Sequence, residues 1–473
     1  MPGTESYTPR QKNLALITMI VAVVLEIVDL TIINTALPAI KADFGAGAEA
    51  VQWIVAGYSL SFALLLMTGG RLGDSYGYRK MFLLGVTGFT LASLGCGLAE
   101  SANQLVFARL MQGATGAIMA PQFMALMQVL FDPLERVSKL ALFGLIGGIS
   151  SIVGPILGGL LIEANLFDLG WRLVFLINLP VGLMAIVSGW FFLPETKSAH
   201  PSGFDLTGTV LFGLAVLGLL WPLTRVEAGW RWAEWSCLIV ALPLIIIGWR
   251  HVARRVAARL PALFDPSLFR VTTFRLGLGI AVAFAAANSG FLLTFAFALQ
   301  TERGQTPLMT GLLHMPFGFG AMIGIAVLGR NFLPRYGKWV LGIGGLVMAA
   351  SALLLLAGIS LWRLDWIALV PLLVICGTGM GTLSGCINPV AVSSVERNHA
   401  GAASALLKTA QQVGAALGVA LAGSIYFAWT FTQIAAPSIA TVGAVAVLLV
   451  VCTILAMMLP ADIFRATQSR SAH

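Results

Sequence analysis

Apolar residues fall into long runs along the chain, and the short polar stretches between the runs hold nearly all the charged residues. A helix that crosses the hydrocarbon core of a bilayer needs roughly 20 apolar residues. Windows of about this length recur and predict fourteen membrane-spanning helices, of which the window at 235-250 is the shortest. The windows cover 14-34, 52-70, 81-99, 104-126, 140-162, 172-193, 205-223, 235-250, 276-299, 309-329, 339-358, 366-387, 402-425 and 438-459.

The composition agrees with lipid as the solvent. Hydrophobic residues make up 58% of the 473 residues and charged residues 10%, which no water-soluble fold of this length could tolerate on its surface. We therefore expect an all-α integral membrane protein. The sequence has no phosphate-binding loop, metal-ligand cluster or nucleophile with a base, so we expect no enzyme, no cofactor and no bound metal.

The basic residues predict how the helices are oriented. With the N-terminus inside, twenty Lys and Arg residues fall in inner segments and six in outer loops. Cytoplasmic loops are rich in Lys and Arg, so we expect both termini in the cytoplasm. The net charge of +8 then reflects orientation in the membrane, and we expect no binding of nucleic acid.

Faint internal echoes predict two related halves. The turn "GGRLGDSYGYRK" is echoed by "LGRNFLPRYGKW", with Gly70 and Gly329 separated by 259 residues. The "GPILGG" stretch is echoed by "GAALGV", with Gly154 and Gly414 separated by 260. Two halves of a transporter with a mid-membrane site between them support alternating access, which is the mechanism that we expect.

The size of this offset predicts an insertion between the halves, because six helices fill only about 180 residues here. We expect a six-helix bundle at 1-200 and two inserted helices at 201-260. A cytoplasmic linker and a second six-helix bundle follow at 261-473. The basic stretch "RHVARRVAARL" either lies on the membrane surface as an amphipathic helix or is a solvated linker.

Four Asp, Glu, Lys or Arg side chains fall inside the predicted spans and away from their end residues, where each costs on the order of 3 kcal/mol. Glu26 and Asp29 are three residues apart, which places both carboxylates on one helix face and predicts a proton site. Arg109 cannot release its proton and needs a partner, for which Asp29 is the natural candidate. The alternative is a static ion pair, and Glu26 alone could face a water-filled cleft without moving protons.

The fourth ionisable residue, Lys408, precedes two amides, Gln411 and Gln412. It either faces substrate or snorkels to the cytoplasmic interface. Asn288 follows Asp29 by 259 residues, so the repeat predicts that the two are counterparts. Six phenylalanines either line an apolar cavity for a bulky substrate or face lipid: Phe284, Phe291, Phe295, Phe297, Phe317 and Phe319. From these sets, the candidate substrate-binding residues are Glu26, Asn288, Phe291, Phe295, Lys408, Gln411 and Gln412.

Small residues follow one another in the fifth window, at Gly144, Gly148, Gly154 and Gly158. They allow helix backbones to approach closely, and Pro155 bends the helix. We expect Gly154, Pro155 and Gly158 to form a tightly packed interface between the halves on the side of the gate. Ordinary packing of small residues is the alternative.

These motifs resemble the major facilitator superfamily, specifically its fourteen-helix drug:proton antiporter branch. "ARLMQGATGA", "GPILGG", "EIVDLTIINTALP" and "WRLVFLINLP" are similar to its signatures on helices 4, 5, 1 and 6. "LQTERGQTPLMTGLLHMP" and "ERNHAGAASALLKTAQQVGAALG" resemble its second-half patterns, so the resemblance covers nearly the whole chain. "GGRLGDSYGYRK" resembles the gating signature between helices 2 and 3, with matches at Gly70, Asp74, Gly77, Arg79 and Lys80.

The resemblance implies the major facilitator fold, with two six-helix bundles plus two inserted helices. It further implies a monomer in the bacterial plasma (inner) membrane that exports amphipathic, cationic toxic compounds in exchange for protons. It makes Asp29 the proton-sensitive acid and Arg109 the proton-transfer arginine. Asp74 with Arg79 would latch the cytoplasmic gate.

The sequence departs from the family at the positions where a substrate preference could be set. Lys408 stands where the family usually has Asn, and Gln411 stands where it usually has Arg. Glu26 replaces a residue that is usually apolar. Export of a single metabolite or antibiotic, and flipping of a lipid or envelope precursor, remain alternatives. The short outer connection at 426-437 argues against the second.

Overall fold

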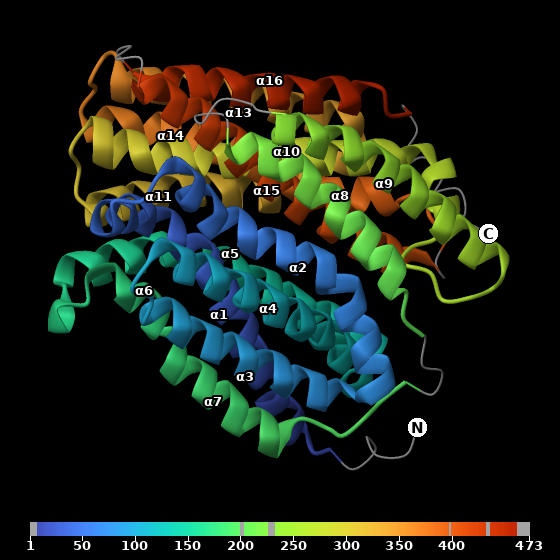
Figure 1. Cartoon of the computed structure of the whole chain (residues 1–473). Helices are drawn as coiled ribbons and strands as arrows, with labels where there is room; N and C mark the ends of the chain where they lie inside the picture. The colour runs from blue at the N-terminus through green and yellow to red at the C-terminus, as the bar shows by residue number, and fades with distance from the viewer. Residues whose placement is uncertain (1–6, 199–202, 226–231, 397–398, 432–435, 461–473) are drawn as a thin grey trace. The chain divides into compact units, whose positions relative to one another are not determined.

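The computed structural model describes residues 7-198, 203-225, 232-396, 399-431 and 436-460 (Figure 1). The ends of the chain, and with them the predicted location of the termini, lie outside these residues, as does part of the connection at 426-437. The described residues form α-helices with short 3-10 and π segments and no strand.

Within these residues, fourteen helical segments are long and apolar enough to cross a membrane, which confirms the predicted number. The shortest window, 235-250, lies in a helix of 26 residues. The segments are α1 (Pro9–Phe44), α2 (Ala48–Tyr76), α3 (Tyr78–Gly97), α4 (Ala102–Leu130), α5 (Pro133–Ala164), α6 (Leu173–Leu176) with α7 (Asn178–Phe192), α8 (Leu206–Thr224), α9 (Trp232–Ala257), α10 (Thr272–Phe297) with η5 (Ala298–Glu302), α11 (Pro307–Ile323) with η6 (Gly324–Gly329) and α12 (Arg330–Tyr336), α13 (Lys338–Ser360), α14 (Trp366–Val392), α15 (Ala400–Phe431) and α16 (Pro437–Met457).

Local signals in the sequence fix several helix ends. Thr8 and Gln11 form a capping box at the start of α1, and Gly45 ends this helix with a left-handed φ of 56°. The turn between α2 and α3 consists of Gly77 alone, whose φ of 106° favours glycine. This requirement explains why a glycine stands in the middle of "GDSYGYRK".

The contacts divide the chain into two compact units, 1-216 with 242-263 and 217-241 with 264-473. In the first unit, α4 packs on α2 and α3, α1 packs on α5 and α7, and α3 packs on α7. In the second, α14 packs on α11 and α13, α10 packs on α15 and α16, and α13 packs on α16. The same five pairings therefore occur in both units, as two related halves require.

The contacts of glycines on α5 and α15 show which residues of α1 and α10 correspond in the two related units. A Cβ on Gly158 would meet Ile32 of α1, and a Cβ on Gly418 would meet Ala286 of α10. Ala286 thus takes the place of Ile32, and Asn288 corresponds to Asn34, two residues after Ile32. The predicted correspondence of Asn288 with Asp29 is therefore wrong, because the chain from α10 to α15 is longer than the chain from α1 to α5.

The inserted pair, α8 and α9, is crossed by the division between the units, so the predicted boundaries at 200 and 260 stay a prediction. A Cβ on Gly248 of α9 would lie 3.1 Å from the Phe212 ring of α8. The basic stretch after 250 continues α9 as far as Ala257. Most of this stretch is therefore helical, as an extension of α9, and its place on the membrane surface stays a prediction.

Candidate functional site

Asp29 lies on α1 inside the first unit, and its side chain is fully buried. Its Oδ2 is 2.6 Å from Nη1 of Arg109 on α4, which is also fully buried. This ion pair is the contact that the sequence predicts. Because both charges lie away from water, each depends on the other and on nearby dipoles for its stability.

Arg109 is held by neighbours on two helices. Its Nη1 donates to Oε1 of Gln112 at 2.6 Å, and its Nε donates to the Ile54 carbonyl of α2 at 3.1 Å. The guanidinium carbon stands 4.5 Å from the centroid of the Tyr58 ring, a cation–π distance. The arginine therefore has a fixed orientation, with one nitrogen directed at Asp29.

Three polar residues complete the network; Gln112 lies in the motif "ARLMQGATGA", and sequence reasoning missed the other two. Gln112 Nε2 donates to Asp29 Oδ1 at 2.7 Å, and Asn178 Nδ2 of α7 donates to the same oxygen at 2.9 Å. Ser93 Oγ of α3 accepts from Gln112 at 2.8 Å. Asn178 gave a weak signal as the polar residue in "FLINLP", whereas Ser93 gave none.

The network suits one protonation state of Asp29. An ionised carboxylate only accepts hydrogen bonds, and Arg109, Gln112 and Asn178 all donate to it. A proton on Asp29 would meet donors on both oxygens and would remove the counter-charge of Arg109. A proton there would thus change the balance of charge and the direction of several hydrogen bonds, and the role of Asp29 as a proton site stays a prediction.

Glu26 is buried one turn before Asp29, with 3% of its surface exposed. The hydrogen bonds that converge on Asp29 come from other helices. Both acids of the predicted pair are thus buried on one helix, as expected, and Asp29 accepts hydrogen bonds from Arg109 and Asn178.

The aromatic residues form a cluster in the second unit. The Phe291 ring stacks on Phe295 and on Phe317, with centroids 5.8 Å and 5.6 Å apart, and His314 meets Phe295 edge-on at 5.1 Å. Five of the six predicted phenylalanines are buried, so facing lipid is the wrong reading for them. Phe319 is 60% exposed and fits that reading.

The remaining candidate substrate residues lie elsewhere in the second unit. Asn288 lies on α10, and its Oδ1 is buried with no hydrogen bond within the described residues. Gln411 and Gln412 are half-buried on α15, and Lys408 is exposed on the same helix. The structure brings Phe291 and Phe295 together, whereas roles in substrate binding for all these residues stay predictions.

The predicted gating residues lie at the turn between α2 and α3. Tyr78 donates to Asp74 at 3.0 Å, and Arg79 pairs with Glu195 at 2.9 Å and donates to the Trp190 carbonyl. Sequence reasoning missed Glu195. Gly70 faces α4, where its Cβ would lie 3.6 Å from Pro121, and Lys80 is exposed. A latch formed by Asp74 with Arg79 stays a prediction.

The glycines of α5 pack inside the first unit. A Cβ on Gly154 would lie 2.0 Å from Thr31 Oγ1, and one on Gly158 would lie 2.7 Å from Ile32 Cγ1. The carbonyl of Pro155 accepts from Thr35 at 3.4 Å. Gly154 and Gly158 therefore face α1 of the same unit, and the interface between the halves stays a prediction. Their role in gating stays a prediction.

Comparison with known proteins agrees with this architecture. The family model described as Major Facilitator Superfamily matches residues 19–419. The chain is 35% identical to a "Probable actinorhodin transporter" of Streptomyces coelicolor, over 90% of this chain and 74% of that protein. It is 33% identical to "Multidrug resistance protein Stp" of Mycobacterium tuberculosis, over 89% and 77%. It is 32% identical to "Multidrug efflux pump LfrA" of Mycolicibacterium smegmatis, over 92% and 85%.

Among solved structures, the fold is similar to a bacterial homolog of the human lysosomal transporter Spinster in an inward-facing, unoccupied conformation. The TM-score is 0.64 at 17% identity, over 98% of both chains. The family and these relatives are transporters and not enzymes. With its fourteen membrane-length helices, the chain is a multi-pass bacterial membrane protein of the Major Facilitator Superfamily, in the fourteen-helix drug:proton antiporter branch.

Proposed function

We propose that this transporter exports amphipathic, cationic toxic compounds from the cytoplasm in exchange for protons, by alternating access. The observation that supports the proposal best is the buried pair of Asp29 and Arg109, 2.6 Å apart in the middle of the first unit. Buried charges inside a membrane are costly, and in transporters they mark proton relays. The protein works as a monomer in the bacterial plasma membrane, with both termini in the cytoplasm.

Proton coupling follows from the way that Asp29 holds its neighbours. While it is ionised, Asp29 fixes Arg109 of α4 and Asn178 of α7 against α1. Uptake of a proton neutralises the carboxylate and leaves the arginine without its counter-charge, so the arrangement of these helices loses stability. The proton thereby favours a second conformation, and its release on the other side restores the first.

Buried groups in each unit support the proposed substrate preference. The stacked rings of Phe291, Phe295 and Phe317 in the second unit suit flat, apolar bodies. Glu26 in the first unit is a buried acid that a cationic group would stabilise. Relatives named for multidrug efflux and multidrug resistance support a broad range of substrates.

The test of coupling uses Asp29→Asn in the full-length protein reconstituted into proteoliposomes. An imposed proton gradient should drive a fluorescent cationic dye across the wild-type membrane, and Asp29→Asn should reduce this movement to the rate without a gradient. Asp43→Asn is the matched control, because Asp43 is the other aspartate of α1 and pairs with Arg172 at the end of the helix. Coupling that survives in Asp29→Asn would refute the assignment.

The names of several relatives favour a second candidate, which is export of one antibiotic. The chain is 34% identical to a "Tetracenomycin C resistance and export protein" of Streptomyces glaucescens and 32% identical to "Puromycin resistance protein pur8" of Streptomyces alboniger. Expression in a susceptible host, tested against a broad panel of toxic compounds, distinguishes the two candidates. Protection against a single compound would favour the dedicated exporter, and protection against several unrelated cations would favour the multidrug transporter.

A further inference from the structure

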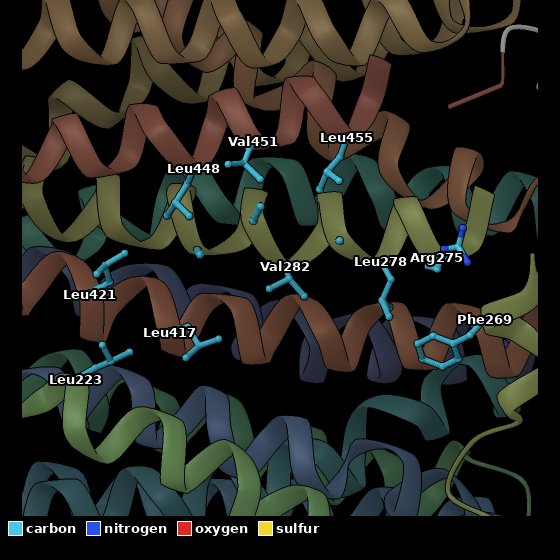
Figure 2. A pocket seen from close by; sticks show the side chains of 13 residues that line it. Leu223, Phe269, Arg275, Leu278, Val282, Leu417, Leu421, Leu448, Val451 and Leu455 are labelled. Atoms are coloured by element: carbon cyan, nitrogen blue, oxygen red, sulfur yellow. The ribbon is translucent and has the colours of Figure 1, made fainter. Parts of the chain in front are cut away.

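An apolar groove runs along the second unit between α10, α15 and α16, and its volume is about 520 Å³ (Figure 2). Arg275 and Phe269 lie at one end of the groove, and Leu223 and Leu421 lie at the other. Apart from Arg275, every residue that lines it is apolar. The lining residues are Leu223, Phe269, Arg275, Leu278, Gly279, Val282, Ala283, Ala286, Leu417, Leu421, Leu448, Val451 and Leu455.

Small residues along one face of α10 leave the space that forms the groove. Gly279, Ala283 and Ala286 recur at the spacing of successive turns, so they share a helix face. Leucines of α15 and α16 form the walls, and a Cβ added to Gly279 would come within 3.2 Å of Leu455. A larger side chain on this face would therefore fill the groove.

The length of the groove corresponds to one leaflet of a bilayer. The lining residues of α10 extend from Arg275 to Ala286, and eleven residues of α-helix rise about 16 Å. Half of a typical hydrocarbon core is about 15 Å thick. The groove thus begins near the start of α10 and ends near the middle of the membrane, which is the depth that one acyl chain reaches.

The positive charge of Arg275 at one end of the groove indicates which polar group the bound molecule carries. The Arg275 side chain is exposed, and within the described part of the chain it has no recorded hydrogen bond or ion pair. A guanidinium at the edge of a membrane is well suited to bind a phosphate through two parallel hydrogen bonds. Basic pockets between membrane helices bind acidic lipid head groups.

We propose that the groove holds an anionic phospholipid, with its phosphate on Arg275 and one acyl chain between α10, α15 and α16. Under the proposed orientation this is a lipid of the cytoplasmic leaflet. The proposal does not depend on proton coupling or on the identity of the exported compound. A cationic drug does not suit this groove, because Arg275 would repel it.

The experiment counts bound lipid by native mass spectrometry on the full-length protein in detergent. The protein is titrated with dioleoyl phosphatidylglycerol, with the zwitterionic dioleoyl phosphatidylcholine, or with oleic acid. Arg275→Gln removes the charge, and Gly279→Leu with Ala283→Leu fills the hollow. The matched controls are Arg270→Gln, at an exposed arginine outside the lining, and Gly443→Leu, where an added Cβ meets nothing within 4 Å.

We expect Arg275→Gln to weaken binding of phosphatidylglycerol about tenfold, with little change for phosphatidylcholine. The filled variant should lose both lipids, and the two controls should bind as the wild type does. Retention of phosphatidylglycerol at wild-type affinity in either Arg275→Gln or the filled variant would overturn the proposal. Oleic acid binding as tightly as phosphatidylglycerol, with the same dependence on Arg275, would also overturn it, because the occupant would then be a free fatty acid. Since Arg275 is exposed, its substitution leaves the helix packing intact even if the filled variant fails to fold.

Discussion

At the scale of single residues, few groups compensate the buried positive charge of Arg109. Within the described residues, its Nη1 and Nε form hydrogen bonds, whereas its Nη2 is buried and forms none. Asp29 is the one carboxylate that pairs with it there, and Tyr58 offers only the face of its ring. Because Asp29 supplies the one ionic partner among the described residues, loss of its charge should destabilise the buried arginine.

Replacing Arg109 alone should destabilise the protein more than replacing both members of the pair. Arg109→Met leaves Asp29 as a buried charge, and breaking a buried ion pair on one side costs about 3–5 kcal/mol. The double variant, Arg109→Met with Asp29→Asn, removes both charges and should recover most of this loss. Thermal unfolding of the purified variants measures the effect. A double variant that is no more stable than Arg109→Met would contradict the argument.

Replacing Glu26 should change which substrate charges the protein prefers more than it changes the coupling to protons. If Glu26 faces the substrate as proposed, this second buried acid would stabilise a second positive charge, so Glu26→Gln should slow export of dicationic dyes by about tenfold or more. Export of monocationic dyes should change little. Glu100→Gln, at an exposed acid, serves as the control in the same transport assay. Equal losses for both classes of dye would point to a role in proton transfer instead.

The sequence could predict Asp29 and Arg109 because a charge inside a membrane is costly and requires a partner. Asn178 and Ser93 could not be predicted in the same way. A neutral amide or hydroxyl in a membrane helix bonds easily to its own backbone, as Ser93 does with the Phe89 carbonyl at 2.9 Å. Such a residue therefore needs no partner on another helix, and the sequence does not indicate which helix it faces.

At the scale of elements, glycine positions decide which helices approach each other most closely. Gly154 and Gly158 of α5 face α1, and Gly414 and Gly418 of α15 face α10. An added Cβ on Gly418 would lie 2.0 Å from the Ala286 carbonyl, so the two backbones nearly touch. The spacing of these glycines in the sequence predicted close packing, but it could not identify the partner helix.

Gly154→Ala should therefore disrupt the packing of α5 on α1. Its Cβ would lie 2.0 Å from Thr31 Oγ1, whose position is fixed by a hydrogen bond to the Ile27 carbonyl. Overpacking of this kind costs about 1–3 kcal/mol, so the thermal unfolding temperature should fall. Gly148→Ala on the same helix meets nothing within 4 Å and should have almost no effect. Equal effects of the two substitutions would show that this contact is not tight.

The helices themselves were predictable because apolar length alone defines a membrane span. Their irregular parts were not. The π segment at Gly324–Gly329 interrupts the span at Pro307–Tyr336, where a Cβ on Gly324 would meet the Thr378 carbonyl of α14 at 2.3 Å. This deformation accommodates a neighbour that is distant in the sequence, so hydropathy gives no sign of it.

At the scale of the whole molecule, the inserted helices are tied to the first unit by a cluster around Asp205. The Asp205 carboxylate accepts from the backbone N–H groups of Gly208 and Leu263 and lies 2.9 Å from His251 Nε2. Arg71 of α2 donates to the carbonyls at both ends of the insertion, Gly203 at 3.2 Å and Ala262. The start of α8, the end of α9 and the following linker are thereby joined to α2.

The same cluster predicts how stability depends on pH. Burial alone would raise the pKa of Asp205, but the hydrogen bonds from Gly208, His251 and Leu263 outweigh burial and leave this pKa below its usual value. A carboxyl with a lowered pKa stabilises the folded state above its unfolded pKa, which is about 3.9 for Asp. This stabilisation is lost as the pH falls through the lower pKa of the folded state.

Asp205→Asn keeps the shape of the side chain and removes its charge, so it should lower stability by about 2 kcal/mol at neutral pH. The difference from the wild type should stay constant down to about pH 5 and then shrink as Asp205 in the wild type becomes protonated. Thermal unfolding measured over this pH range checks the effect. Asp132→Asn is the control, because Asp132 is exposed and forms no capping hydrogen bond with its side chain. If the difference in stability between Asp205→Asn and the wild type persisted in acid, the shape of the side chain, and not its charge, would hold α8 and α9 in place.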